Sequence, residues 1–369
     1  MSNGVHFRPT RAEISRDALF HNAKIARQLT GDARLIGVVK ANGYGHGAIA
    51  VAEAISAQVD AFAVAFIDEA IELRNAGFLQ PIVLLEGCLS AAELPVCAHY
   101  NFQPVVHQQQ QLDDIVTARL VRPLAVWLKI DTGMHRLGWQ PSQVAQINQE
   151  LKASSQVASV TMMSHLANAN QLTHLLNSRQ MELFEDICAT TEANLDISVA
   201  NSAALVSTAI DLAHKSQQWM RAGIILYGDN PIGRLAPLPE PLQPVMRLVA
   251  PIIALREVAV GESVGYGSTW TAERESRIAT LAIGYADGYP RHAENGTPVF
   301  IQGREMPLAG TVSMDMITVD VTDLEQVAVG DEVELWGPNL PVAKVANHAR
   351  TISYDLLTGV TARVPRVYL

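Results

Sequence analysis

Lys40 is the first residue whose type and position could support covalent chemistry. It closes the apolar run LIGVV and opens ANGYGHG, a glycine-rich polar loop that leads into a helix. Apolar surroundings disfavour the charged ammonium, so the free amine becomes available to form a Schiff base with a carbonyl compound. A lysine that merely extends from an apolar rim into water would occupy the same position. The chain contains only six lysines, which makes one at a strand end unusual.

The ends of later apolar runs carry further groups that a cofactor site would need. These residues are Lys129, Asp131 and Arg136 after the fifth run, His165 after the sixth, Asn201 and Ser202 after the seventh, and Arg221, Gly223, Ile224 and Tyr227 in the eighth. The seventh and eighth strands of barrels commonly hold a phosphate, and Ser202 with the amides of Gly223 and Ile224 could form that cradle. A Schiff-base lysine beside a phosphate site indicates either pyridoxal phosphate (PLP) or a sugar-phosphate aldolase.

These residues need a scaffold that gathers strand ends at one rim, and the sequence predicts such a scaffold. Eight short apolar runs alternate with helical stretches between residues 34 and 228, and they begin at residues 34, 60, 81, 101, 122, 157, 196 and 219. Eight strand-helix units in about 200 residues favour a (β/α)8 barrel of the TIM type. An open doubly wound sheet would more often show G-x-G-x-x-G after its first strand, and that motif is missing.

The second part of the chain has a different pattern. The stretch APLPEPLQP places four prolines in nine residues, which is typical of a stiff linker. Short alternating segments separated by glycine turns follow it, and only VAKVANHAR has a helical pattern. We therefore predict a barrel domain over residues 1–238 and a mostly-β domain over residues 239–369. Residues 108–111, a run of glutamines, are interpreted as a solvated helix surface.

Composition and charge exclude several classes of protein. The 369 residues carry a net charge of −10, with 49% hydrophobic and 17% charged residues, which argues against intrinsic disorder, nucleic-acid binding and association with an anionic membrane. The N-terminus lacks the apolar core of a signal peptide, and the three cysteines form no C-x-x-C pair. We therefore expect a cytoplasmic location.

Several motifs, taken together, resemble the alanine racemases. They are VVKANGYGHG, WLKIDTGMHRLG, SHLANAN, NSAAL, RAGIILYG, VGYGSTW, IGYADGYPR and AGTVSMDM, and the resemblance continues to the final RVPRVYL. The resemblance implies an α/β protein with an N-terminal barrel, a C-terminal mostly-β domain and PLP as cofactor. It also implies interconversion of L-alanine and D-alanine, which supplies D-alanine for peptidoglycan or serves alanine catabolism.

The same resemblance assigns two acid/base groups, which racemisation needs on opposite faces of Cα. Lys40 forms the Schiff base with PLP and then acts as a base on one face. Tyr266, in the G-Y-G motif, faces it from the other subunit of a head-to-tail homodimer, and His165 with Arg221 forms the hydrogen-bond chain that assists it. The proline-rich linker suits this arrangement, because a stiff segment holds the second domain away from its own barrel.

Cofactor and substrate contacts also follow from the resemblance. The cofactor is expected among Lys40, Tyr44, His165, Asn201, Ser202, Arg221, Gly223, Ile224 and Tyr354, with Arg221 at the pyridine nitrogen and the two tyrosines near the phosphate. Lys129 is expected to be carbamylated and to orient Arg136, although an ordinary ion pair with Asp131 is an alternative. Arg136 and the Met314 amide receive the substrate carboxylate. Tyr285 and Tyr354 form a narrow gate.

Other proteins share part of this pattern. A PLP amino-acid decarboxylase of the same barrel type would share Lys40, but such enzymes usually carry a catalytic cysteine in the β domain, and residues 240–369 contain none. A non-catalytic PLP-binding barrel would need no second domain. A metal-dependent aldolase would need clustered ligands, and because the sequence shows no H-x-x-x-H, we expect no metal. A racemase of broader small-amino-acid specificity stays open, because Asn170 stands where related sequences often carry an acidic residue.

Overall fold

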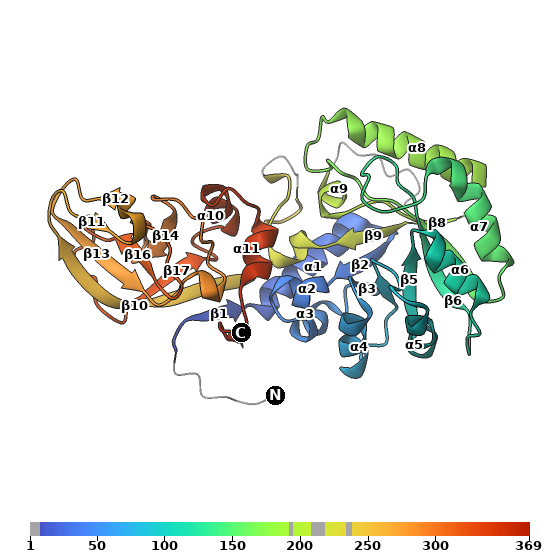
Figure 1. Cartoon of the computed structure of the whole chain (residues 1–369), viewed down its shortest axis with the longest axis horizontal. Helices are drawn as coiled ribbons and strands as arrows, with labels where there is room; N and C mark the ends of the chain where they lie inside the picture. The colour runs from blue at the N-terminus through green and yellow to red at the C-terminus, as the bar shows by residue number, and fades with distance from the viewer. Residues whose placement is uncertain (1–7, 192–194, 208–217, 234–237) are drawn as a thin grey trace. The chain divides into compact units, whose positions relative to one another are not determined.

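The computed structural model describes residues 8–191, 195–207, 218–233 and 238–369 (Figure 1). Backbone contacts divide the chain into two compact units. The first, which we call the barrel unit, comprises Leu19–Gly43 and Ala48–Leu242. The second, the β unit, comprises residues through Ala18, Tyr44–Gly47 and Gln243–Leu369. The division expected at residues 238 and 239 remains a prediction. Residues 234–237 of the expected linker region lie outside the described residues, and residues 238–245 form no helix or strand.

The barrel unit contains an eight-stranded parallel sheet in the order β8-β7-β6-β5-β4-β3-β2-β9. Its strands are β2 (Arg34–Val38), β3 (Ala61–Val64), β4 (Ile82–Leu84), β5 (Phe102–Val106), β6 (Leu124–Lys129), β7 (Val157–Met163), β8 (Asp196–Ser198) and β9 (Trp219–Ala222). A parallel bridge between Ile197 and Gln218 joins the two ends of this order, so the barrel is nearly closed. Each strand lies within one of the eight apolar runs, which confirms the predicted barrel.

Helices connect these strands and cover the apolar sheet (Figure 1). They are α1 (Arg16–Thr30), α2 (Lys40–Tyr44), α3 (Ala48–Ile55), α4 (Ile67–Asn75), α5 (Leu94–Tyr100), α6 (Gln109–Thr117), α7 (Val144–Ala153), α8 (Leu175–Thr191) and α9 (Ser202–Val206), with 3₁₀ turns η1 (Ala91–Glu93), η2 (Pro141–Gln143) and η4 (Ile224–Tyr227). Strand β3 is buried along its whole length, as expected for parallel strands enclosed on both faces. No helix in the described part of the chain is long and apolar enough to cross a bilayer.

The β unit is built on a second sheet, which confirms the mostly-β prediction. The order β15-β14-β17-β10-β1-β18 is joined by β13, which pairs with β10 and β16. The strands are β1 (Arg11–Ile14), β10 (Met246–Val258), β13 (Ser276–Leu281), β14 (Pro298–Ile301), β15 (Arg304–Pro307), β16 (Ile317–Asp320), β17 (Glu332–Trp336) and β18 (Arg366–Tyr368), with a hairpin of β11 (Ser263–Val264) and β12 (Trp270–Thr271). The turns η6 (Tyr266–Ser268) and η7 (Tyr285–Asp287) complete it.

Of the two helices of this unit the sequence predicted one, and it did not predict strand β1. The predicted helix is α10 (Val342–His348), but α11 (Ser353–Gly359) was not expected. Strand β1, near the N-terminus, was also not expected; it pairs antiparallel with β10 and parallel with β18. A short strand with alternating charged residues carries little pattern by itself, so its partners decide its conformation.

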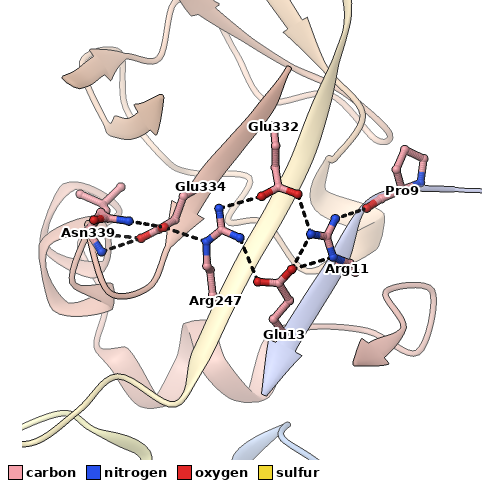
Figure 2. A network of polar contacts seen from close by, with 8 residues as sticks. Pro9, Arg11, Glu13, Arg247, Glu332, Glu334 and Asn339 are labelled. Carbon is pink, nitrogen blue, oxygen red and sulfur yellow. Dashed lines mark hydrogen bonds and ion pairs between the residues drawn. The ribbon is translucent and has the colours of Figure 1, made fainter. Parts of the chain in front are cut away.

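Charged side chains join β1 to β10 and β17 in one network (Figure 2). Arg11 and Arg247 both contact Glu13 and Glu332, and Arg247 also donates to Glu334 from Nε at 3.0 Å. The Glu334 side chain is buried and accepts three further hydrogen bonds, from the Asn339 amide, the Asn339 side chain and the Leu340 amide. The charged side chains of this network lie on the less buried face of β1, whereas Ala12 and Ile14 are fully buried on the other face, so ion pairs and apolar packing both support its register.

Candidate functional site

The carboxyl ends of the barrel strands carry the residues that sequence analysis selected. Lys40 follows β2 by two positions, Lys129 is the last residue of β6, and His165 follows β7 by two positions. Asn201 comes three positions after β8, and Arg221 lies within β9. Because parallel strands of a barrel end at one rim, the fold places these groups around one mouth.

The loop after Lys40 has an unusual backbone conformation. Ala41, Asn42 and Tyr44 have φ angles of 53°, 53° and 50°, and Gly43 between them has 61°. A left-handed conformation costs an L-residue about 1–2 kcal/mol, so three such residues in one loop need support from their surroundings. Part of this support comes from the Asn42 side chain, which accepts a hydrogen bond from the Ala48 amide at 2.9 Å.

Arg221 places a buried cation beneath the rim. Its guanidinium donates to the Ser198 hydroxyl, to the carbonyl oxygens of Ser164 at 2.9 Å and Val199 at 3.1 Å, and to His165 Nδ1 at 3.2 Å. Burial lowers the pKa of Arg221 to about 10, so the group still carries its proton at neutral pH. No carboxylate of the described residues forms an ion pair with it, and its charge is held by neutral acceptors alone.

His165 is held as a neutral ring. Burial holds its pKa well below the usual value, and the charges of Arg221 and Lys129 act in the same direction. Because Nδ1 accepts from the Arg221 guanidinium, the proton of the neutral ring belongs on Nε2. The Asn201 amide nitrogen lies 3.5 Å from that Nε2 atom. His165 therefore keeps one N–H available for an acceptor at the rim.

Ser202 and Gly223 come together as the predicted cradle requires. The Gly223 amide donates to Ser202 Oγ at 2.8 Å. Ser202 begins α9, whose N-terminal cap is Asn201, and Ile224 begins the turn η4. Amide groups at the starts of helical turns attract anions, but a phosphate at this point would have to take the Gly223 amide from the Ser202 oxygen that it bonds in this chain.

Lys129 is buried at the end of β6, with 8% of its surface exposed. Burial, followed by the charge of Arg221, lowers its pKa to about 8, although the Glu86 carboxylate acts in the opposite direction. The alternative partner, Asp131, is engaged elsewhere: its carboxylate accepts from the amides of Gly133 and His135, each at 3.0 Å. Residues 8–191, 195–207, 218–233 and 238–369 contain no Lys129–Asp131 ion pair, so that alternative is wrong for this structure.

The glutamine run contains a residue that sequence analysis misjudged. Gln111 is only 4% exposed rather than solvated. Its side-chain nitrogen donates to the carbonyl oxygens of Glu86 at 3.2 Å and Cys88 at 3.1 Å, and its oxygen accepts from the His107 amide at 2.9 Å. Gln111 therefore fixes the loop that presents Glu86 to Lys129. The His107 amide is a local partner, but the two carbonyl oxygens are distant in sequence, so the local pattern could not show that the Gln111 side chain is buried.

The β unit carries the remaining predicted site residues. The Tyr44 and Tyr354 rings pack together with centroids 5.9 Å apart, and burial raises the pKa of the Tyr44 phenol. Segment 311–314 contacts two of the other predicted residues. The Thr311 hydroxyl donates to the Tyr266 carbonyl oxygen at 2.9 Å, and the Tyr285 amide donates to the Ser313 carbonyl oxygen at 3.0 Å.

Three of these side chains of the β unit are exposed to solvent. Tyr266 is 71% exposed, Met314 53% and Tyr285 39%. Arg136, in the barrel unit, is also exposed, and no hydrogen bond or ion pair to it is present in the described part of the chain. The side chains expected to meet substrate are thus exposed in this chain, whereas Arg221 and Ser202, expected to hold the cofactor, are buried and hydrogen-bonded.

The fold and the rim define the class of protein: a barrel enzyme whose lysine and buried arginine suit an anionic carbonyl cofactor. The family profiles described as alanine racemase N-terminal domain and C-terminal domain match residues 14–231 and 245–368. The chain is 47% identical over 361 residues to the catabolic alanine racemase of Pseudomonas aeruginosa, covering 98% of this chain and 99% of that protein. It is 46% identical over 362 residues to the alanine racemase of Chromohalobacter salexigens, covering 98% of each.

Solved structures agree with these matches. The biosynthetic alanine racemase of Pseudomonas aeruginosa is similar with a TM-score of 0.93 and 43% identity, over 98% of this chain and 100% of that one. The Bartonella henselae alanine racemase, described with covalently bound pyridoxal phosphate, is similar with a TM-score of 0.87 and 31% identity, over 98% of this chain and 99% of that one. The chain belongs to the alanine racemase family, as its motifs indicated.

Proposed function

We propose that this protein interconverts L-alanine and D-alanine with PLP as its cofactor. Its family membership supports the substrate and the isomerase class. The observation that carries the proposal is Arg221, a buried guanidinium at the barrel rim bonded only to neutral acceptors. A decarboxylase of the same fold lacks support, because the described residues of the β unit include no cysteine.

The residues present fit PLP. Lys40 is half-buried at the rim and would supply the amine for covalent attachment. Ser202, Gly223 and Ile224 would supply a hydroxyl and two amides for the phosphate, with the Gly223 amide released from the Ser202 oxygen that it bonds in this chain. Tyr44 and Tyr354 would complete the phosphate contacts, and His165 and Asn201 would line the ring. When bound, PLP withdraws electron density from the substrate Cα and so acidifies its proton.

Arg221 controls the choice of reaction. A guanidinium at the pyridine nitrogen donates a hydrogen bond but keeps its proton, because its pKa of about 10 lies well above neutrality. A ring nitrogen that only accepts this hydrogen bond would withdraw less electron density from the substrate than a protonated one. Arg221 would thereby favour return of the proton to Cα over transamination.

Two groups exchange the Cα proton in this proposal. Lys40 removes or returns it on one face, and Tyr266 of the partner subunit acts on the other. His165, neutral and bonded to Arg221, keeps an Nε2–H that can donate to the phenol oxygen and stabilise its anionic form. The 71% exposure of Tyr266 in this single chain is what a group that serves another subunit requires.

The homodimer can be tested separately from the chemistry. Mixed subunits carrying Lys40→Ala and Tyr266→Phe would form heterodimers with one site in which both bases are intact. We expect such mixtures to regain activity that neither variant has alone. Failure to regain activity, once subunit exchange has been demonstrated, would place both bases in one chain.

Lys129 is proposed to be carbamylated. Only a neutral amine attacks CO2, with loss of one proton, and the lowered pKa of about 8 provides that amine near neutral pH. The product is an anion that can pair with Arg136, which then receives the substrate carboxylate together with the Met314 amide. Tyr285 and Tyr354 would form the gate that limits entry to small amino acids.

The overall function is tested with one set of measurements. The purified PLP-loaded protein should abolish the circular dichroism of L-alanine and, equally, that of D-alanine. L-Serine, supplied in parallel, decides between a narrow and a broader racemase. Steady production of pyruvate or of a decarboxylated amine, without loss of optical activity, would overturn the proposal.

We place the enzyme in the cytoplasm, because a reducing compartment suits its three free thiols.

A further inference from the structure

Glu69 has no role in the site described above, yet its carboxylate reaches the backbone beside Lys40. It is the third residue of α4. One carboxylate oxygen, Oε2, accepts from the amides of Ala65 at 2.8 Å and Phe66 at 3.2 Å. The other oxygen, Oε1, accepts from the amide of Ala41 at 2.6 Å.

The bonds to the amides of Ala65 and Phe66 are those expected at the start of a helix, whereas the bond to Ala41 is not. A glutamate in the third helical position commonly folds back to the amide of the N-cap residue, which here is Phe66. The bond to Ala41 crosses instead to the loop after the neighbouring strand, because β2 and β3 pair in parallel. Helix capping therefore does not explain it.

The bond acts on the peptide group that contains Lys40. The Ala41 amide and the Lys40 carbonyl belong to one planar unit, so an acceptor fixed at the Ala41 N–H fixes the ψ angle of Lys40. Ala41 and Asn42 both have a φ of 53°, a conformation that L-residues rarely keep without outside contacts. A charged acceptor makes this contact stronger than a neutral one would.

We propose that Glu69 is a positioning residue for Lys40: its carboxylate ties the loop after β2 to the start of α4 and so sets the direction of the Lys40 side chain. The contact stands independently of the reaction, but its consequence for catalysis rests on the proposed function of Lys40. No bond to cofactor or substrate is part of the proposal.

The test compares Glu69→Ala with Asp68→Ala. Asp68 is the matched control, because it is the preceding acidic residue in the same helical turn, is exposed, and makes no hydrogen bond in the described part of the chain. Amide hydrogen exchange of Ala41 in the PLP-loaded protein reports the contact directly. We expect at least a tenfold faster exchange in Glu69→Ala and no change in Asp68→Ala.

Catalysis and cofactor attachment provide the second readout. In Glu69→Ala, kcat for alanine should fall by about 10–100-fold, with a smaller change in KM, because a misplaced base costs rate rather than binding. The rate at which the PLP-free protein acquires the visible absorption of the attached cofactor should fall as well. Glu69→Gln, which keeps the length and one acceptor oxygen, should lie between Glu69→Ala and the parent protein.

The outcomes separate the contact from the proposed function. Unchanged Ala41 exchange in Glu69→Ala, or faster exchange with unchanged kcat and unchanged attachment, would overturn the positioning role. Borohydride reduction followed by peptide mapping identifies the attached lysine independently. A label on Lys129 instead of Lys40 would overturn the proposed role of Lys40, whereas the exchange result for Ala41 would still decide the contact. If Glu69→Ala does not fold, Glu69→Gln provides the same comparisons.

Discussion

The network drawn in Figure 2 allows a quantitative test of what holds the β unit together. In Glu334→Ala, the buried Leu340 amide loses its acceptor, which costs about 1–3 kcal/mol. Arg247 loses one charge-assisted bond, but it stays paired with Glu13 and Glu332 and is 31% exposed. The loss of this bond therefore adds only about 1 kcal/mol to the destabilisation. Asn339 is exposed, so its amide can donate to water instead, and the loss of its bond to Glu334 adds little to the destabilisation. The sum is about 2–4 kcal/mol.

Glu332→Ala is the matched control for this variant. It removes a carboxylate that pairs with Arg247, as Glu334 does, and also with Arg11, but its side chain is 36% exposed and it accepts no backbone amide in the described residues. Exposed pairs of this kind contribute about 1 kcal/mol or less. The two variants thus differ in burial and backbone bonding while each removes one charge.

Thermal unfolding followed by circular dichroism measures the difference. At about 2–4 °C per kcal/mol for a domain of this size, the first transition should fall by roughly 5–15 °C in Glu334→Ala and by under about 4 °C in Glu332→Ala. The two units can unfold separately, so the transition must be assigned to the β unit by amide hydrogen exchange of β17, because the five tryptophans of the chain do not report on one unit. Equal shifts of the transition temperature in the two variants would refute the reasoning, because the loss of one charge, and not the burial of the carboxylate, would then determine the loss of stability.

Three further results are expected. Arg221→Glu should raise pyruvate formation relative to racemisation, measured with lactate dehydrogenase, and an unchanged ratio would remove the account of reaction choice. Uptake of ¹³CO2 at Lys129, observed by NMR, should rise between about pH 7 and 9 as an amine of pKa about 8 loses its proton, and uptake independent of pH would contradict this. Burial raises the pKa of Asp287, but the hydrogen bonds from Arg8 and the Gly284 amide, together with the charges of Arg8 and Arg363, outweigh burial and lower that pKa. Stability from this pair is therefore complete above about pH 4 and is lost as pH falls through the lowered pKa, so Asp287→Asn should flatten the acid side of a plot of Tm against pH.

The barrel could be predicted because most residues of its parallel strands are buried, although β7 has two exposed ones near its start, so the strands lie in largely apolar runs. Lys40 and Arg221 could be selected because charged residues interrupt or end such runs. The positions of their supports could not be predicted in the same way. Gln111 and Glu69 resemble ordinary residues of a helix surface, and only the fold brings their backbone partners within reach.

Lys129 shows why sequence proximity is a poor guide to ion pairing. Asp131 lies two positions away, a spacing that places two residues on one face of a strand, but β6 ends at Lys129 and Asp131 already belongs to the turn that follows. The carboxylate accepts from the amides of its own turn, at Gly133 and His135, and its second oxygen contacts the His135 ring at 3.0 Å. A lysine buried by the fold is then left among other cations, a situation that no local pattern describes.

The pairing of β1 with β10 and β18 sets an order of assembly during synthesis. Residues 11–14 leave the ribosome first, yet their partners are residues 246–249 and the final residues 366–368. The barrel strands lie between these segments and pair only with one another, so they can associate while both partners of β1 are still missing. The β unit, in contrast, depends on contacts that span almost the whole chain, which makes its closure the slow and late event of folding.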